Sequence, residues 1–280
     1  MEAAPDAPLP SPPSSSRSMP AVRAPGLPTA LGFIVLYFLL QATVGALVAF
    51  TLGLWLGFRA SLHHLTNDAK AMGHQVQAML AQPDARAAMV MLVLCVAAGS
   101  MLWLTHRKWP RLWSLASPPG FAMVRPAQPL FYLLAILIGL TAPVLGGWLT
   151  QWLAHGHKVP QDIQRVGAEA ALPLRVALMV VVVTVGPLVE ELLFRGVLLS
   201  ALLRRLRTGW AVTACSLLFA LVHLPDLGFL WYALPGLALL AAALAWLRLR
   251  SGSLWPAVLA HGVNNLLAVA AWFLAVKPTG

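Results

Sequence analysis

The stretch "VGPLVEELLFRGVLLS", residues 185–200, places two adjacent carboxylates and an arginine inside an otherwise apolar run. In a helix, Glu191 and Arg195 share one face because they are four residues apart, and the acidic residue comes first, which is the better order for an ion pair. Glu190 points about 100° away from that face. The stretch therefore predicts one ion pair within a helix and one carboxylate that has no partner on its own helix.

The composition indicates a membrane protein. The chain has 280 residues, of which 59% are hydrophobic and only 10% are charged, whereas a soluble domain carries roughly 25% charged residues. The formal net charge of +10 does not indicate nucleic-acid binding, because the basic residues lie between apolar runs rather than on one face. Such charges set the topology of a membrane protein and contact anionic headgroups, so the expected partner is the lipid bilayer.

Seven apolar runs are long enough to be considered as membrane spans, since a bilayer core needs about 20 residues of helix. We therefore expect an all-α fold, a polytopic transmembrane helical bundle with about seven spans. The fourth run is long and the fifth is short, so we expect tilt or protrusion. The runs cover 30–58, 87–105, 129–154, 173–203, 209–224, 229–247 and 254–275.

The distribution of basic residues predicts the orientation. With the N-terminus in the cytoplasm, eleven of the 19 Lys and Arg residues lie in inside segments and six in outside segments, as the positive-inside rule requires. The alanine-rich composition, with more arginine than lysine and no organelle signal, favours a multi-pass protein of a bacterial inner membrane. The C-terminus is then outside.

Three regions follow from these runs. Residues 1–28 are rich in Pro, Ala and Ser and are expected to form a disordered cytoplasmic tail. Residues 29–172 should hold N-terminal transmembrane helices and loops, including an outside loop at 59–86 in which amphipathic pieces are possible. Residues 173–275 should form a core that carries the polar groups described next.

Few polar groups lie deep in the apolar runs. Glu190 and Glu191 are the two deep acidic residues, and a charge at the bilayer centre costs at least about 2.5–3.5 kcal/mol. His223 and His261 lie in later runs, and Asn265 follows His261 by one turn on the same helix face. Polar groups in lipid satisfy one another, so these groups are expected to close a single cavity.

Two kinds of chemistry fit these groups. A carboxylate and an imidazole together can deprotonate a water molecule, and an imidazole and an amide can donate hydrogen bonds to a developing oxyanion. Alternatively Glu190, His223 and His261 could bind zinc, with a metal-bound water as the nucleophile. The HExxH zinc signature is absent from the sequence.

Three motifs, on the fourth, fifth and seventh apolar runs, carry a family resemblance. They are "EELLFR", "FALVH" and "HGVNN", which match the patterns EExxxR, FxxxH and HxxxN. In this order they resemble the CPBP family of intramembrane proteases, which includes the CAAX prenyl endopeptidases and the bacterial Abi proteins. The resemblance covers residues 173–275. The matching residues are Glu190, Glu191, Arg195, Phe219, His223, His261 and Asn265.

The resemblance implies a catalytic role for four of these residues. Glu190 would be the general base, and His223 would orient and activate the water. His261 and Asn265 would form the oxyanion hole. The prenyl endopeptidases of the family look like glutamate-dependent enzymes, which favours a mechanism without a cofactor and leaves zinc as the alternative.

The other three matched residues would support the site. Glu191 and Arg195 would form a structural pair, and Phe219 would shape the pocket. The resemblance implies a hydrolase that cleaves a peptide or protein substrate in the membrane, whether prenylated or not.

Two other functions remain open from the sequence. The same fold could serve as a non-catalytic membrane scaffold or bacteriocin-immunity protein. A proton-coupled transporter could also use a Glu and His chain as a proton relay, but the first three runs contain no deep charge, which weighs against a polar path to both faces.

Overall fold

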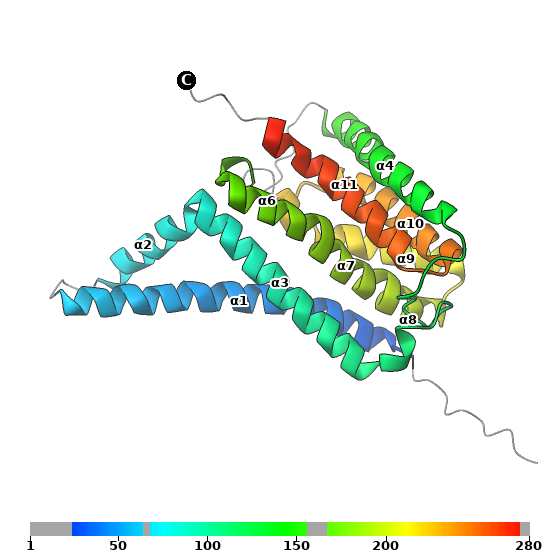
Figure 1. Ribbon diagram of the computed structural model, residues 1–280, viewed down its shortest axis with the longest axis horizontal. Helices are drawn as coiled ribbons and strands as arrows, with labels where there is room; N and C mark the ends of the chain where they lie inside the picture. The colour runs from blue at the N-terminus through cyan, green and yellow to red at the C-terminus, as the bar shows by residue number, and fades with distance from the viewer. Residues whose placement is uncertain (1–23, 64–67, 156–166, 275–280) are drawn as a thin grey trace, which may run out of the picture.

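The computed structural model describes residues 24–63, 68–155 and 167–274, and these residues form helices and connecting segments with no strand among them (Figure 1). This architecture confirms the predicted all-α helical bundle. The α-helices are α1 (Leu27–Leu62), α2 (Ala69–Ala81), α3 (Pro83–Lys108), α4 (Leu130–Ala154), α6 (Leu172–Val180), α7 (Gly186–Glu191), α8 (Leu199–Leu203), α9 (Thr208–Val222), α10 (Leu234–Ser251) and α11 (Trp255–Leu274).

Each of the predicted apolar runs contains a helix. Within the described residues, five helical segments are long and apolar enough to cross a membrane, and α9 is apolar but shorter. Large apolar side chains face outwards, as Trp148 (78% exposed) and Trp210 (70% exposed) illustrate. A surface of this kind is suited to lipid rather than water, and the chain is therefore a multi-pass membrane protein.

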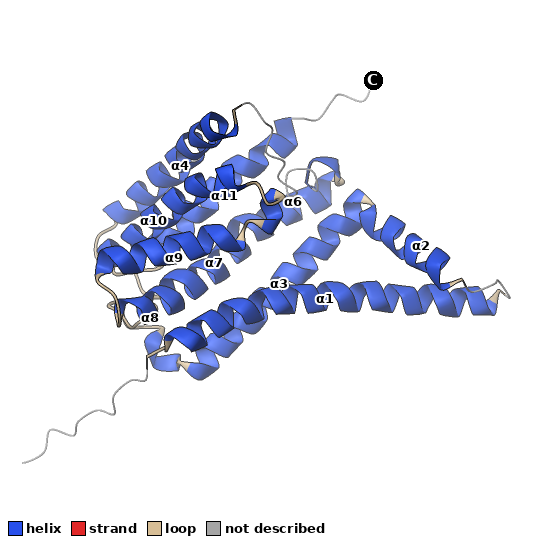
Figure 2. Cartoon of the chain, turned by 180° about the vertical axis from the view of Figure 1, so that it is seen from behind, coloured by secondary structure: helices blue, strands red, loops and turns tan. Residues whose placement is uncertain are grey.

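The predicted outside loop at 59–86 is mostly helical. Helix α1 continues to Leu62, and α2 follows after a side-chain cap in which Asp68 accepts a hydrogen bond from the backbone N–H of Lys70 at 3.0 Å. Figures 1 and 2 show that α1, α2 and α3 outline a triangle, one corner of which projects from the remaining helices. The predicted tail at 1–28 lies mostly outside the described residues.

The fourth span is a continuous helix over 172–203 that contains two π-helical segments, which the apolar pattern did not predict. They occupy Val181–Val185 and Leu192–Leu198 and flank α7 on both sides. A π-helical turn shifts the hydrogen bonds from i→i+4 to i→i+5, and such turns often occur at functional sites. Here the short helix between them ends with Glu190 and Glu191.

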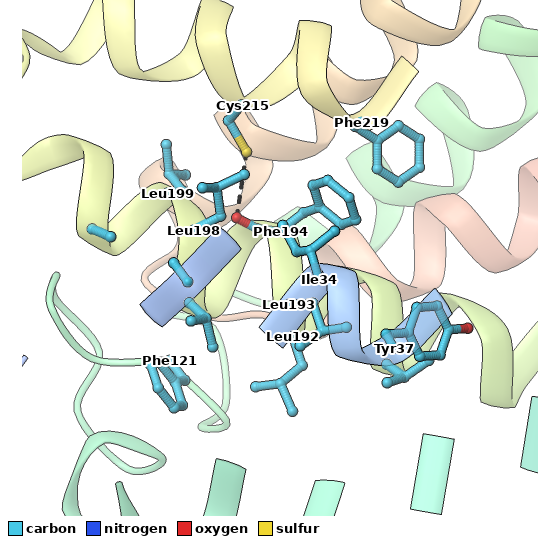
Figure 3. Close-up of a cluster of buried hydrophobic side chains, with 14 of the residues drawn as sticks. Ile34, Tyr37, Phe121, Leu192, Leu193, Phe194, Leu198, Leu199, Cys215 and Phe219 are labelled. Atoms are coloured by element: carbon cyan, nitrogen blue, oxygen red, sulfur yellow. Dashed lines mark hydrogen bonds between the residues drawn. The ribbon is translucent and has the colours of Figure 1, made fainter. Parts of the chain in front are cut away.

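The largest apolar core lies against the second π-helical segment, as Figure 3 shows around Leu192, Leu193 and Phe194. The rings of Phe194 and Phe219 meet edge to face, with centroids 5.0 Å apart. Phe121, from the connection between α3 and α4, is fully buried in the same core. The core therefore fixes this helix against α9 and against the connection that follows α3.

The connection between α3 and α4, at residues 109–129, is a packed segment rather than an open loop. The backbone N–H of Leu254 donates to the carbonyl of Ala122 at 2.8 Å, and the buried Arg248 donates to the carbonyl of Gly120 at 2.7 Å. These bonds join the segment to the end of α10 and to the turn between α10 and α11. They set the position at which α11 begins.

Candidate active site

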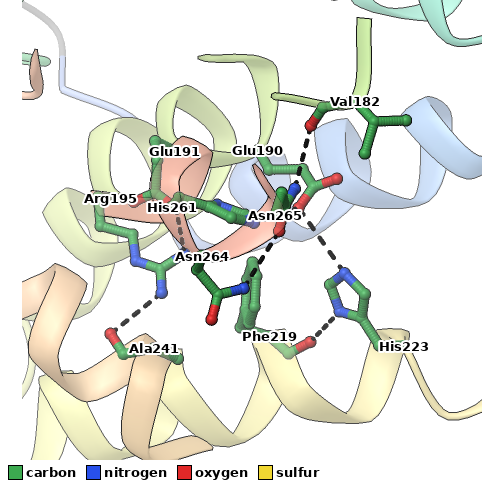
Figure 4. A network of polar contacts seen from close by, with 10 residues as sticks. All are labelled: Val182, Glu190, Glu191, Arg195, Phe219, His223, Ala241, His261, Asn264 and Asn265. Atoms are coloured by element: carbon green, nitrogen blue, oxygen red, sulfur yellow. Dashed lines mark hydrogen bonds and ion pairs between the residues drawn. The ribbon is translucent and has the colours of Figure 1, made fainter. Parts of the chain in front are cut away.

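The structure brings the four predicted catalytic residues together from three places in the chain (Figure 4). Glu190 lies near the end of α7, and His261 and Asn265 lie on α11. His223 follows the last residue of α9 as its C-terminal cap rather than lying within the helix. Because α9 has only 15 residues, its end reaches the level of Glu190 instead of crossing the whole bundle.

The Glu190 carboxylate lies between two imidazoles. Its Oε2 atom is 3.7 Å from Nε2 of His223 and 3.8 Å from Nε2 of His261. Both distances exceed the range of a direct hydrogen bond. The side chains of Glu190 and His223 are 19% and 25% exposed, and that of His261 is 6% exposed. The carboxylate is thus reachable on the His223 side and enclosed on the His261 side.

Hydrogen bonds at the far side of each ring fix the orientation of both imidazoles. The Nδ1 atom of His223 lies 2.7 Å from the carbonyl oxygen of Phe219, and Nδ1 of His261 lies 2.9 Å from Oε1 of Glu191. A carbonyl or carboxylate oxygen accepts, so each Nδ1 carries the proton and each Nε2 faces Glu190. Each unprotonated Nε2 atom is therefore an acceptor, as is the carboxylate. A hydrogen bond between them requires either a second proton on the imidazole or a water molecule that donates to both.

Glu191 forms the ion pair that its spacing from Arg195 predicts. Arg195 donates to Oε1 of Glu191 at 3.0 Å, and both side chains are fully buried. The guanidinium also donates to the carbonyl of Ala241 at 3.0 Å and lies 4.4 Å from the ring centroid of Phe219. The contact between Glu191 and His261 was not predicted, because nothing in the spacing of one helix shows which side chain of another helix will meet it.

Phe219 forms an apolar wall beside the two imidazoles. Its ring is 1% exposed, and its centroid lies 4.6 Å from that of His223 and 5.7 Å from that of His261. The ring therefore limits the movement of both imidazoles. Phe219 also belongs to the largest apolar core, so its ring lies between that core and the two imidazoles.

Helix α11 rests on the first π-helical segment. The side-chain amide of Asn265 donates to the carbonyl of Val182 at 3.1 Å, and Asn264 donates to the side-chain oxygen of Asn265 at 3.2 Å. A Cβ atom at Gly262 would lie 2.6 Å from the carbonyl oxygen of Val183, so the glycine permits this close approach. Sequence reasoning missed Asn264, although the adjacent pair "NN" was a visible signal.

The residues considered as alternative zinc ligands are Glu190, His223 and His261, which do meet at this site. However, within residues 24–63, 68–155 and 167–274 no group of three or more His, Cys, Asp or Glu side chains is placed so that it could hold a metal ion.

One family model matches the part of the chain that carries this site. Residues 172–267 match the type II CAAX prenyl endopeptidase Rce1-like family. No curated protein and no solved structure matches the chain. The matched segment begins with α6 and ends within α11, and it contains every site residue predicted from the three motifs. It confirms the resemblance for this segment and implies a CAAX-type intramembrane protease, a hydrolase.

Proposed function

We propose that this protein, whose residues 172–267 form an Rce1-like domain, is an intramembrane endopeptidase that hydrolyses a peptide bond with a water molecule activated by Glu190. The observation that carries the proposal is the position of the Glu190 carboxylate between the Nε2 atoms of His223 and His261. A partly enclosed carboxylate with two imidazoles directed at it can act as a general base that removes a proton from water.

The first step is the attack of water. Glu190 takes one proton from a water molecule that His223 orients through Nε2, and the hydroxide oxygen bonds to the carbonyl carbon of the substrate. The electron pair of the C=O bond moves to oxygen, which becomes an oxyanion. The exposure of the Glu190 and His223 side chains provides the side from which water and substrate can approach.

The oxyanion is stabilised from α11. Asn265 uses one amide N–H on the carbonyl of Val182 and retains a second N–H for the substrate. His261 already donates its Nδ1 proton to Glu191, so Nε2 can donate to the oxyanion only when the ring is protonated. Preorganised donors of this kind stabilise the charge of the transition state.

The intermediate then collapses. The C=O bond re-forms, the C–N bond breaks, and the leaving amine takes the proton that Glu190 had accepted. Glu190 returns to its ionised form, and no covalent intermediate with the protein is needed. Glu191, Arg195 and Phe219 hold the two imidazoles in place throughout.

We further propose that the reaction needs no cofactor. Activity measured on purified protein should therefore survive extended dialysis against a zinc chelator and should not rise when zinc is restored. Loss of activity on chelation, with recovery on zinc addition, would instead support the alternative in which Glu190, His223 and His261 are metal ligands.

The proposed substrate is a peptide or protein held in the membrane, prenylated or not. The site lies about halfway along the helix over 172–203, since Glu190 is roughly 20 Å from its C-terminal end at 1.5 Å per residue. A peptide bond at that depth must belong to a membrane-embedded or lipid-anchored chain. We also propose that the N-terminus is cytoplasmic and that the membrane is a bacterial inner membrane.

The experiment compares new protein termini, identified by mass spectrometry, in membranes from cells that produce the wild type, Glu190→Gln or Glu169→Gln at equal levels. Glu169 is an exposed acidic residue outside the site, so its variant is the matched control. We expect termini that are present with the wild type and Glu169→Gln and absent with Glu190→Gln.

The opposite result would also be informative. If the termini are the same in all three membranes while a biological effect of the protein is retained by Glu190→Gln, the protein is not a protease. The non-catalytic scaffold or bacteriocin-immunity function would then be favoured.

A further inference from the structure

A second side-chain amide lies beside the amide assigned to the oxyanion, and it takes no part in the mechanism above. Asn264 is partly buried on α11, and its side-chain N–H donates to Oδ1 of Asn265 at 3.2 Å (Figure 4). The HxxxN pattern specifies His261 and Asn265 but not Asn264. The contact therefore adds a residue for which the motif does not account.

Asn264 flanks the face of α11 that carries the site. It follows His261 by three residues and Asn265 follows by four, so the two amides lie on either side of His261 around the helix. The next two residues, Leu266 and Leu267, are exposed. An amide within an apolar span needs a hydrogen-bond partner, and the partner of Asn264 belongs to the site.

Two hydrogen bonds fix the orientation of the Asn265 amide. An amide group can turn by 180° and exchange its oxygen and its nitrogen. The carbonyl of Val182 accepts at 3.1 Å and so selects the nitrogen on one side. The N–H of Asn264 donates and so selects the oxygen on the other side. Both partners favour the same orientation, in which Asn265 retains its second N–H for the substrate.

We propose that Asn264 is a positioning residue that acts through Asn265, by holding the Asn265 amide in the orientation that donates to the oxyanion. This inference rests on the proposed function and deepens it. The bond from Asn264 also draws electron density towards Oδ1 of Asn265. Because hydrogen bonds in a chain polarise one another, the N–H groups of Asn265 become stronger donors.

The test uses Asn264→Leu, which removes the donor and keeps a side chain of similar size. Gln151→Leu is the matched control, since Gln151 is an exposed amide near the end of α4. Purified full-length proteins in detergent are assayed for cleavage of a substrate identified from the new termini, and their thermal unfolding is recorded.

For Asn264→Leu we expect kcat to fall roughly 3- to 10-fold, the effect of losing one hydrogen bond. KM should stay close to that of the wild type. The unfolding midpoint should not fall, because leucine is favourable in a membrane span. Gln151→Leu should change neither kcat nor KM.

A double-variant cycle shows whether Asn264 acts through Asn265. Asn265→Ala alone removes a proposed oxyanion donor and should lower kcat roughly 100-fold. In the double variant, Asn264→Leu should lower kcat no further, since the amide that Asn264 orients is gone. A purely structural role for Asn264 would lower kcat by the same factor in both backgrounds.

Three results would overturn the inference: an unchanged kcat in Asn264→Leu, an equal fall of kcat in both backgrounds, or a fall matched by a lower unfolding midpoint. Glu190→Gln, assayed beside these variants, keeps such a failure distinct from a failure of the proposed function. If Glu190→Gln abolishes cleavage, the proposed function stands whatever Asn264→Leu does. If Glu190→Gln cleaves as the wild type does, the proposed function is wrong, and the inference falls with it.

Discussion

Glu191 makes two contacts in the site, and its position in the sequence predicts only one of them. Its Oε1 atom accepts from Arg195 on the same helix and from His261 on α11, at 3.0 and 2.9 Å. The first contact stabilises a buried charge, and the second fixes the ring whose other nitrogen faces Glu190. In the proposed mechanism Glu191 therefore positions His261 as well as forming half of an ion pair.

This double role can be separated by mutation. Glu191→Leu alone leaves the buried Arg195 charge unpaired and should destabilise the protein by about 3–5 kcal/mol. Replacing both residues with leucine should restore much of the lost stability, because an apolar pair often substitutes for a buried ion pair. Activity should stay low in both variants, since His261 has lost its acceptor.

Thermal unfolding and a cleavage assay on the same preparations check these expectations. Recovery of activity together with stability in the double variant would show that Glu191 acts only through Arg195.

At the scale of helices, the position of α11 against the fourth span sets the distances of the site. Two hydrogen bonds hold α11 in this position. Asn265 donates to the carbonyl of Val182, and the buried Arg175 at the start of α6 donates to the carbonyl of Trp272 near the end of α11 at 2.9 Å. The π-helical segment at Val181–Val185 supplies the carbonyl that accepts the first of these bonds. Its widened turn therefore helps to hold α11, the helix that carries His261, in place.

A pair of glycine variants tests this contact. In Gly262→Ala the new Cβ would meet the backbone carbonyl of Val183 at 2.6 Å, so α11 must move away and both stability and activity should fall. Gly147→Ala on α4 is the control, because nothing lies within 4 Å of its Cβ. There alanine should be neutral or stabilising by up to roughly 1 kcal/mol.

Unfolding midpoints and cleavage rates of the two glycine variants give the answer. If both variants have the same unfolding midpoint and the same cleavage rate, α11 does not approach the backbone of Val183 closely at Gly262.

At the scale of the whole molecule, the apolar outer surface and the triangle of α1, α2 and α3 determine how the chain sits in a bilayer. Exposed tryptophans mark both ends of the bundle, including Trp152 near the end of α4 and Trp210 near the start of α9. Tryptophan favours the boundary between lipid and water. The connection after α3 and helix α2 should then lie on opposite sides of the membrane.

Single cysteines test this topology. Ser114, in the connection after α3, and Gln77, on α2, are both exposed. In a Cys95→Ala background, which removes the exposed native thiol and leaves the buried Cys215, Gln77→Cys should react with an impermeant reagent in intact cells. Ser114→Cys should react only after the cells are opened.

The reverse labelling pattern would place the N-terminus outside. Reaction of both cysteines in intact cells would contradict opposite sides for the two segments.

Patterns in the amino-acid sequence were enough to predict where the helices lie and which polar groups they carry. Apolar runs of spanning length and the four-residue spacing of Glu191 and Arg195 are local patterns, and local patterns follow from helix geometry. The exact ends were less certain, as the longer α1 and the capping position of His223 show. The three motifs were enough to indicate the family of residues 172–267.

Which atoms of these groups meet became visible only in the folded arrangement of the helices. Several contacts at the site join residues from different parts of the chain. The Nε2 atoms of His223 and His261 face Glu190, His261 donates to Glu191, and Asn265 donates to the carbonyl of Val182. Such contacts depend on how helices pack, on π-helical turns and on glycines that allow close approach. These properties belong to pairs of elements, and the pattern of a single helix does not contain them.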